Sequence, residues 1–165
     1  MTAVPDPSPD ILDALRAGPE VFDALLTGCT EDEARNARGG DEGWSVVEVL
    51  CHLRDAEERA LERTRAMLRE DRPHLPAYDQ EAWAGERNYQ GDEPAGALAA
   101  YARFRWDHIA ELERGTPGGW AREGLHEEQG AVTVQSHAIH MAAHDAVHAA
   151  QIGRQLRAYR QRAGR

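Results

Sequence analysis

Apolar residues recur every three or four positions along most of the chain, which is the spacing of amphipathic helices. The clearest case begins after Ser45 and runs to about residue 70. Ser45 and Glu48 have the spacing of a capping box, in which each side chain binds a free backbone N–H of the first turn. A long helix is therefore predicted there, with one apolar face formed by Val46, Val49, Leu50, Leu53, Ala56, Ala60, Met67 and Leu68.

A first helical region is expected over about residues 9–28. It contains Gly18-Pro19, and proline is tolerated in the first turn of a helix but not in its interior. We therefore expect an interruption there, with Pro19 opening the second half. Residues 1–8 are expected to be a flexible lead-in, and residues 29–43 a loop.

Helical spacing resumes after residue 78, with a short helix expected over about residues 79–88. Pro94, preceded by two acidic residues, opens the third long helix. After an expected loop at 121–130, Thr133 is a suitable N-cap for a last helix that runs to about residue 159. Strand-like alternation is nearly absent, so the pattern predicts an all-α fold, an antiparallel four-helix bundle.

Length and charge limit what this bundle does. The chain has 165 residues and a mass of 18.3 kDa, which fits a single domain over residues 1–165. The formal net charge of −10 disfavours a nucleic-acid partner. We expect no membrane partner, because no apolar run approaches the roughly 18 residues of a span. Cys29 and Cys51 form no disulfide pattern, and the first residues do not resemble a signal peptide, so we expect a cytoplasmic protein.

Four of the eight histidines lie close together in the last predicted helix, at 137, 140, 144 and 148. His144 and His148 lie on one helical face, about 6 Å apart along the axis, so their imidazoles can bind one metal ion. Exposed or hydrogen-bonded histidines have the same spacing, so the pair alone leaves both interpretations open. Small alanines leave room around the pair, and Gln151 is placed to hold a ligand or a bound water.

Two familiar metal motifs do not fit this helix. The string HDAVH has the spacing of the zinc-protease motif H-E-x-x-H, but Asp145 replaces the glutamate and no acidic residue follows His148. A di-iron carboxylate bundle needs Glu-x-x-His on helices, and the one match, Glu123 to His126, lies in a predicted loop. A third ligand must come from upstream, where His52 is the best candidate, although a single histidine bordering an apolar stripe is more often structural and spacing alone does not decide.

Several stretches resemble the DinB-like superfamily of small metal-binding four-helix bundles, in that family's order and over about residues 9–157. The most specific part combines W-S-x-x-E-x-x-x-H-L, at 44–53, with H-D-x-x-H-x-x-Q, at 144–151. The resemblance implies a metal site formed by His52, His144 and His148. The other matching stretches are RPHLPAYDQEAW, YARFRWDHIAEL and GWAREGLHEEQGAVT.

The same resemblance implies one divalent metal ion, with zinc or nickel favoured and iron, manganese or copper as alternatives. It also implies a metal-dependent transferase that activates a low-molecular-weight thiol, of the bacillithiol or mycothiol type, for attack on an electrophile. A homodimer is a further implication. The alternatives are a non-catalytic metal-binding stress-response bundle and an interaction module whose histidines are structural. Because metal ligands must be neutral, we expect metal affinity to weaken below about pH 6.5.

Further polar residues are candidates for supporting the ligands or facing a substrate. Asp55 either orients an imidazole or pairs with Arg59, and His126 either overlooks the metal or lies on the loop surface. His137 is expected on the rim of the site. Cys51 lies about 100° away from His52 around the helix and is not a ligand candidate. For Arg105 and His108, ordinary packing is favoured over contact with the carboxylates of an anionic thiol. The full set of candidates outside the three ligands is Gln151, His140, His126, Asp55, Arg105 and His108.

Overall fold

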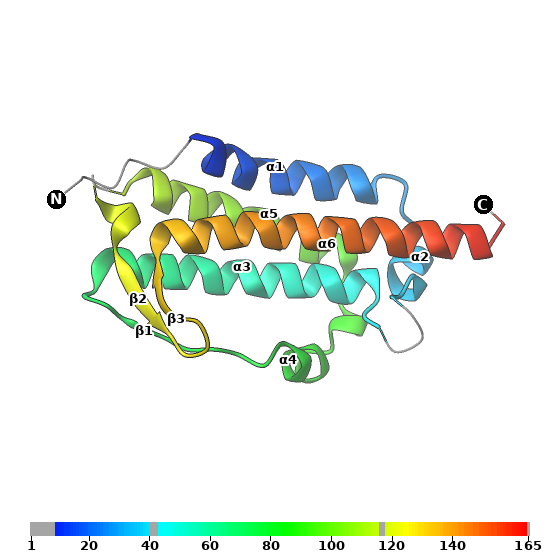
Figure 1. Cartoon of the computed structure of the whole chain (residues 1–165). Helices are drawn as coiled ribbons and strands as arrows, with labels where there is room; N and C mark the ends of the chain where they lie inside the picture. Colours follow the sequence, from blue (N-terminus) through cyan, green and yellow to red (C-terminus); the bar gives the residue numbers. More distant parts are fainter. Residues whose placement is uncertain (1–8, 40–42, 116–117, 165) are drawn as a thin grey trace.

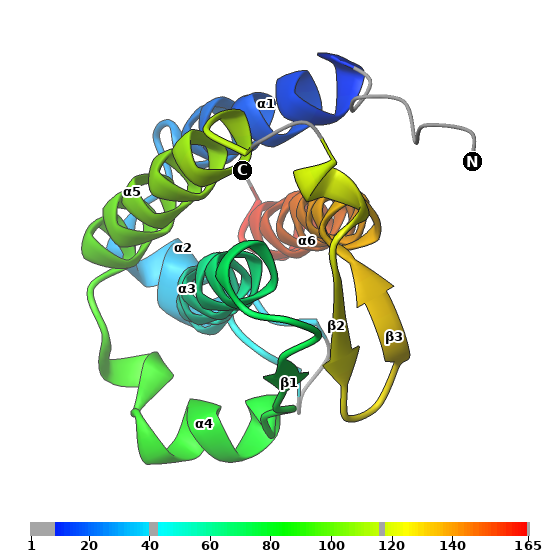
Figure 2. The same ribbon diagram turned by 90° about the vertical axis from the view of Figure 1, so that its left-hand side faces the viewer.

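Four long helices form the bundle in the computed structural model, which describes residues 9–39, 43–115 and 118–164 (Figure 1). The expected lead-in at 1–8 lies outside the described residues. Both α1 and α3 pack against α5 and α6, so α1 and α3 occupy opposite corners of the bundle (Figure 2). The predicted four-helix bundle is confirmed, with helices α1 (Pro9–Leu26), α3 (Val46–Arg69), α5 (Pro94–Glu113) and α6 (Val134–Arg162).

The bundle is not antiparallel throughout, as the sequence led us to expect. In Figure 1, α1 and α6 run in one direction while α3 and α5 run in the other, so the adjacent helices α3 and α5 are parallel. The reason is the long connection at 70–93, which returns the chain to the end where α3 begins. This crossover contains β1 (His74–Leu75), α4 (Gln80–Glu86) and the 3₁₀ turn η1 (Tyr89–Gly91).

A small sheet replaces the loop expected at 121–130. After the 3₁₀ turn η2 (Gly119–Ala121), strands β2 (Glu123–His126) and β3 (Gly130–Thr133) form an antiparallel hairpin. Strand β1 of the crossover pairs with β2 in parallel. Side chains of β2 alternate between exposed and buried, but four residues are too few for such alternation to be recognised in the sequence.

A short helix, α2 (Glu31–Asn36), was also missed because the whole segment was expected to be a loop. Its start carries a capping box of the kind predicted for α3: the Thr30 hydroxyl accepts from the backbone N–H of Glu33, and the Glu33 side chain accepts from that of Thr30. The T-x-x-E signal was therefore present in the sequence. None of the helices in the described part of the chain combines the length and apolar character of a membrane span.

Helix α1 continues through Pro19, contrary to the predicted interruption. A proline provides no N–H for the carbonyl four residues earlier, which here is that of Leu15. The Arg105 guanidinium from α5 donates to this carbonyl at 3.1 Å. The neighbouring Gly18 is buried and leaves room for this contact, since a Cβ there would lie 2.9 Å from Arg105 Nη1. Tertiary contact therefore supplies the hydrogen bond that the proline removes.

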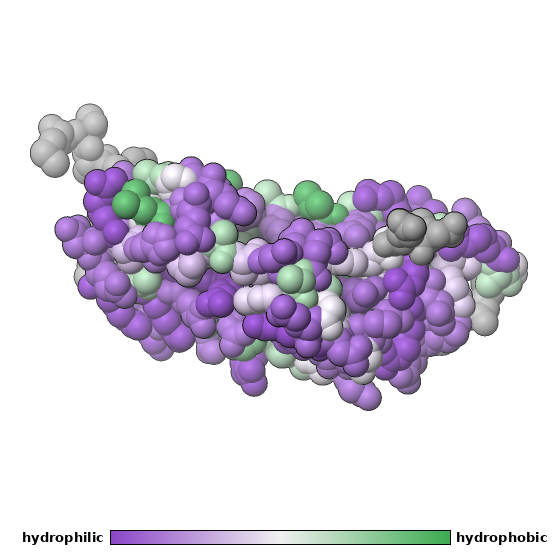
Figure 3. All heavy atoms as spheres, turned by 90° about the horizontal axis from the view of Figure 1, so that it is seen from below, coloured by the Kyte–Doolittle hydropathy of each residue, from purple (hydrophilic) through white to green (hydrophobic). Residues whose placement is uncertain are grey.

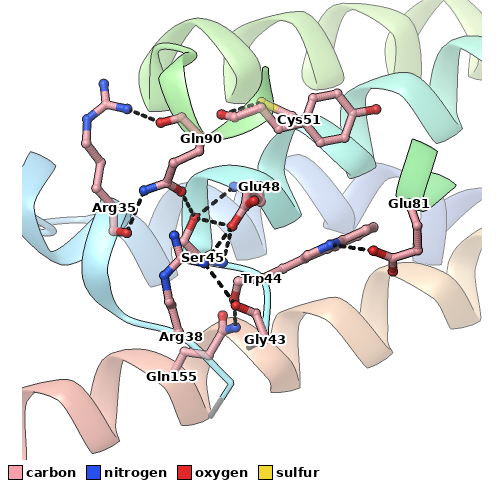
Figure 4. Close-up of polar contacts among 11 residues, drawn as sticks. Arg35, Arg38, Gly43, Trp44, Ser45, Glu48, Cys51, Glu81, Gln90 and Gln155 are labelled. Carbon is pink, nitrogen blue, oxygen red and sulfur yellow. Dashed lines mark hydrogen bonds and ion pairs between the residues drawn. The ribbon is translucent and has the colours of Figure 1, made fainter. Parts of the chain in front are cut away.

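The first turn of α3 is attached to three other parts of the molecule (Figure 4). The predicted capping box of Ser45 and Glu48 is present, and the Ser45 hydroxyl also donates to Gln90 Oε1 at 2.6 Å. The Gln155 amide of α6 donates to the Trp44 carbonyl at 2.7 Å, and the Trp44 indole donates to Glu81 Oε2 at 3.1 Å. These bonds fix the start of α3, and with it the residues two turns later, relative to α4 and α6.

Candidate metal centre

Three imidazoles from two helices converge on one point between α3 and α6. His52 Nε2 lies 2.9 Å from His144 Nε2, which in turn lies 3.2 Å from His148 Nε2. One nitrogen from each of the three rings lies within 4.8 Å of those from the other two. The structure thus brings together the three histidines that the sequence analysis singled out as metal ligands.

These three nitrogens cannot satisfy one another by hydrogen bonding. His148 Nδ1 lies 2.7 Å from Gln151 Oε1, and an amide oxygen only accepts, so Nδ1 carries the proton and His148 Nε2 is a lone pair. If His144 Nε2 donates to His148, it cannot accept from His52. If it accepts from His52, two lone pairs face each other across the contact with His148. A cation shared by three lone pairs removes this conflict, so the donor set fits a metal ion.

Burial keeps the three rings neutral. His52 is only 3% exposed, and its burial lowers its pKa to about 4, with the neighbouring His148 adding to the effect. Burial and then the charges of His148 and His52 lower the pKa of His144 to about 2. Burial also lowers the pKa of His148. Neutral imidazole is the form that binds metals. With these lowered pKa values, protons should compete with the metal for the imidazoles only well below the pH of about 6.5 expected from the sequence.

The centre lies beside a pocket of about 690 Å³, within the usual range for small-molecule sites. His52 and His144 line this pocket, together with residues 77–80 of the crossover and part of the β2–β3 hairpin. His148 lines a smaller adjacent hollow with Trp44 and Gln151. Because two of its ligands line the larger pocket, a bound ion would lie at the wall of that pocket.

Two of the remaining candidates, His126 and His140, also line the larger pocket. His126 lies in β2 rather than in a loop and is 7% exposed. Its Nδ1 accepts from the Glu128 backbone N–H at 3.2 Å, so its Nε2 carries the proton. The His140 ring centroid lies 6.2 Å from that of His144, and His140 is outside the converging group.

His137 is not on the rim, where it was expected. It is 7% exposed and lines the pocket, and burial lowers its pKa to about 3. The helical spacing that places His144 toward α3 also places His137 two turns earlier on the same face. This feature of the pocket could have been found from the sequence.

Arg105 and His108 are fully buried in the bundle core, which is the packing role favoured from the sequence over contact with a substrate. Arg105 binds Glu57 Oε2 at 2.6 Å and Asp145 Oδ2 at 2.5 Å. His108 has Glu57 Oε1 2.7 Å from Nδ1 and Thr64 Oγ1 2.8 Å from Nε2. Burial alone would raise the pKa of Glu57, but the charge of Arg105 and the hydrogen bonds from His108 and Arg105 lower it to about 2. Arg105 therefore compensates the charge of the buried carboxylates.

Asp55 was expected to orient an imidazole or to pair with Arg59, and it does neither. It accepts from the Tyr89 hydroxyl at 2.5 Å and from Arg87 and Arg54 at 2.8 and 2.7 Å. These bonds attach α3 to the crossover. Arg59 instead pairs with Glu62.

Cys51 lies apart from the converging nitrogens, in agreement with the prediction that it is not a ligand. It is fully buried, with its sulfur 3.5 Å from Asp92 Oδ2. Burial raises the pKa of this thiol to about 12. A thiol that stays protonated is neither a good ligand nor a good nucleophile.

Comparison with known proteins places the chain among other small helical proteins. Residues 14–152 match a family model described as the DinB superfamily. A protein of Geobacillus thermodenitrificans is 32% identical over 100 residues, and YfiT of Bacillus subtilis is 24% identical over 120 residues. The names of both describe candidate metal-dependent hydrolases. The matches cover 59% and 70% of this chain, and the chain spans 56% and 67% of the lengths of these relatives.

The fold itself is also known from a solved structure. YfiT from Bacillus subtilis superimposes with a TM-score of 0.83 at 22% sequence identity, covering 94% of this chain and 86% of the other. That structure is described as a probable metal-dependent hydrolase with an unusual four-helix bundle topology. The likeness establishes the arrangement of helices, including the long crossover between parallel neighbours.

Proposed function

The chain belongs to the DinB superfamily, and on this premise we propose that it is a divalent-metal-dependent enzyme that activates a low-molecular-weight thiol for attack on an electrophile. His52, His144 and His148 would hold the ion. The observation that carries the proposal is the convergence of their three Nε2 atoms. That of His144 lies 2.9 Å from that of His52 and 3.2 Å from that of His148. Ligand bonds of about 2.0–2.1 Å to one ion place neighbouring nitrogens at about this separation.

The choice of ligands supports a catalytic rather than a structural site. Closed structural zinc sites have four protein ligands, whereas catalytic sites have three and leave a position open. When bound, a divalent ion supplies Lewis acidity, which lowers the pKa of a coordinated thiol or water and makes it nucleophilic at neutral pH. Three neutral imidazoles add no negative charge, which favours an anionic thiolate as the further ligand.

The chain's own groups would prepare the reaction around this point. Gln151 holds the proton on His148 Nδ1 and so keeps its Nε2 available. His140, on the pocket wall one turn before His144, is suited to accept the proton that a thiol releases. The pocket offers space for the electrophile beside His52 and His144.

The names of the relatives favour a second candidate, hydrolysis. Water would then replace the thiol as the nucleophile in the same pocket. Both candidates use the same ligands and the same open position, so the identity of the nucleophile distinguishes them.

The test begins with the metal content of protein purified without chelator and without a nickel column, measured by mass spectrometry. Consumption of a mycothiol- or bacillithiol-type thiol is then measured with an alkylating electrophile, alongside hydrolysis of activated esters without thiol. We expect about one ion per chain and metal-dependent thiol consumption, both lost in His148→Ala. His74→Ala is the control, because His74 is exposed on β1 and pairs with Glu127.

Each result has a distinct meaning. Metal-dependent ester hydrolysis without thiol consumption would favour the second candidate. One bound ion with neither activity would leave a metal-binding bundle without turnover. Protein that binds no divalent ion would overturn the proposal altogether.

A further inference from the structure

The pocket extends well beyond the three histidines. Along α3 its wall runs from His52 through Ala56 to Arg63, and eleven helical residues span roughly 16 Å. Along α6, which runs in the opposite direction, the wall runs from His144 back to His137. The end remote from the metal centre is therefore bounded by Arg63 and His137, with His126 of the hairpin beside them.

Arg63 occupies an unusual position for a cation in this acidic protein. It is half-buried, and among the described residues no carboxylate lies within ion-pair distance of it. Its Nη2 donates to the Pro76 carbonyl at 2.6 Å, and its guanidinium carbon lies 6.0 Å from the Tyr78 ring centroid. These contacts hold the group in place while leaving its other N–H donors without an anionic partner. A partly buried cation without a direct ion pair favours binding of an opposite charge.

The surrounding imidazoles add hydrogen-bond donors to this end of the pocket. His126 Nδ1 accepts from the backbone, so its Nε2–H is free to donate. His137 Nε2 is buried and has no hydrogen-bond partner within the described part of the chain. Arg63 and His126 line the same pocket, and after the effect of burial the charge of Arg63 lowers the pKa of His126.

We infer that Arg63 and His126 bind a carboxylate of the molecule on which the metal centre acts. The Arg63 guanidinium would pair with the carboxylate and His126 Nε2–H would donate to it. The inference rests on the proposed function only in taking this pocket as the substrate site. It adds a substrate class: an elongated molecule with its reacting group at one end and a single carboxylate at the other.

A single negative charge fits better than a phosphate dianion. Asp79 and Glu128 line the same pocket, and their charges would repel a second negative charge on the ligand. The side of the molecule that carries α4 and the hairpin turn is predominantly hydrophilic, with apolar residues in small separate patches (Figure 3). This surface suits a polar, water-soluble substrate.

The test uses the full chain with the metal it carries when purified. Hexanoate and its neutral analogue hexanamide are titrated, and binding is followed by NMR through the histidine ring signals. We expect hexanoate to bind about 10-fold or more tightly than hexanamide, as for a hydrogen-bonded charge pair. Arg63→Gln should remove this preference, and Arg63→Lys should restore part of it.

Two controls locate the carboxylate. Arg59→Gln, one turn earlier on α3 where the side chain pairs with Glu62, should keep the preference. His148→Ala should keep it as well, because the carboxylate is not expected to bind at the metal. The reverse pattern, with the preference lost in His148→Ala and kept in a folded Arg63→Gln, would overturn the inference.

Two further measurements complete the design. Hexylphosphonate, as a dianion, should bind more weakly than hexanoate, and tighter binding would refute the carboxylate assignment. Metal content of Arg63→Gln should equal that of the wild type. A wild type without metal would refute the proposed function, whereas the comparison of Arg63 variants would still decide the carboxylate site.

Discussion

A histidine can bind a metal or pack in a core, and the partners of its two ring nitrogens decide between these roles. In His108 both nitrogens are occupied, by Glu57 and by Thr64, so no lone pair is left for an ion. In His148 the Gln151 amide occupies Nδ1 alone, and Nε2 points toward His52 and His144. At the scale of the residue, the hydrogen bond to Nδ1 leaves Nε2 of His148 available, whereas Nδ1 of His52 and of His144 has no hydrogen-bond partner in the described part of the chain.

Removal of one converging nitrogen should abolish metal binding. In His148→Ala two ligands remain, so we expect stoichiometric metal to be lost on dialysis, as measured by mass spectrometry. His140→Ala should retain about one ion per chain, because His140 is outside the converging group. If His148→Ala retained the metal and His140→Ala lost it, the two ligands from α6 would be His140 and His144 instead.

Removal of the supporting amide should have an intermediate effect. Gln151→Ala keeps all three ligands but frees His148 to change tautomer, so we expect metal affinity to fall by about 10- to 100-fold. Competition with a chromophoric chelator measures the change. Gln161→Ala, an exposed position at the end of α6, is the matched control and should bind as the wild type does. An unchanged affinity in Gln151→Ala would show that the amide does not orient the ring.

The sequence predicted the grouping of the three histidines but not the roles of Arg105, His108 and Asp55. Helical spacing gives the face on which a residue lies, and the resemblance to a known family added the partner helix for His52. For Arg105 the deciding partners are Glu57 and Asp145, on two other helices. Spacing within one helix carries no information about such partners, so the sequence favoured packing for Arg105 without identifying its ion pairs.

At the scale of elements, local chemistry explains where the helices begin. The sequence predicted Ser45 and Thr133 as the N-caps of α3 and α6, and residue 79 as the start of the segment that contains α4. The side chains of Ser45, Asp79 and Thr133 each accept a hydrogen bond from a backbone N–H of the first turn. The continuity of α1 and the pairing of β1 with β2 could not be predicted locally, because both depend on contacts with distant segments. The parallel placement of α3 and α5 likewise depends on the path of the crossover.

The two helical glycines Gly18 and Gly153 should respond in opposite ways to the same substitution. A Cβ at Gly18 would lie 2.4 Å from Asp145 Oδ2 and 2.5 Å from the Tyr101 hydroxyl. Gly18→Ala should therefore lower the free energy of unfolding by about 1–3 kcal/mol, as overpacking does. A Cβ at Gly153 would meet only Leu25 at 3.9 Å, so Gly153→Ala should raise it by about 0.5–1 kcal/mol through the preference of helices for alanine.

Urea unfolding of both variants measures this difference. If Gly18→Ala were as stable as the wild type, the close packing of α1 on Asp145 would be wrong. Destabilisation by Gly153→Ala would indicate a contact at α6 that the structure does not contain.

For the whole molecule, buried neutral histidines make folding sensitive to mild acid. His52 and His137 are 3% and 7% exposed, and burial lowers their pKa values to about 4 and about 3. In the unfolded chain a histidine titrates near 6.5. Below that pH the unfolded state binds more protons than the folded state, so stability is greatest above about 6.5 and falls as the pH decreases.

The metal-free protein should therefore lose stability between pH 6.5 and pH 5, by at most about 1.4 kcal/mol per pH unit for each such histidine. Urea midpoints measured in the presence of chelator at pH 7.5, 6.5 and 5 test this. His137→Leu should flatten the dependence, because one of the titrating groups is removed. A midpoint that stays constant from pH 7.5 to 5 would contradict the buried, neutral state of these rings.

The packing of α1 has a consequence for synthesis on the ribosome. Its main partners are α5 and α6. The Leu15 carbonyl accepts a hydrogen bond from Arg105 of α5, which can form only after α5 has been synthesised. At about 5–20 residues per second, the roughly 120 residues from the end of α1 to Asp145 take about 6–24 s to make. Until α6 is complete, Leu15 and Phe22, both fully buried in the finished protein, have only part of their covering, from α5. The first helix to emerge is therefore among the last to complete its packing, and its apolar face stays partly exposed while the rest of the chain is made.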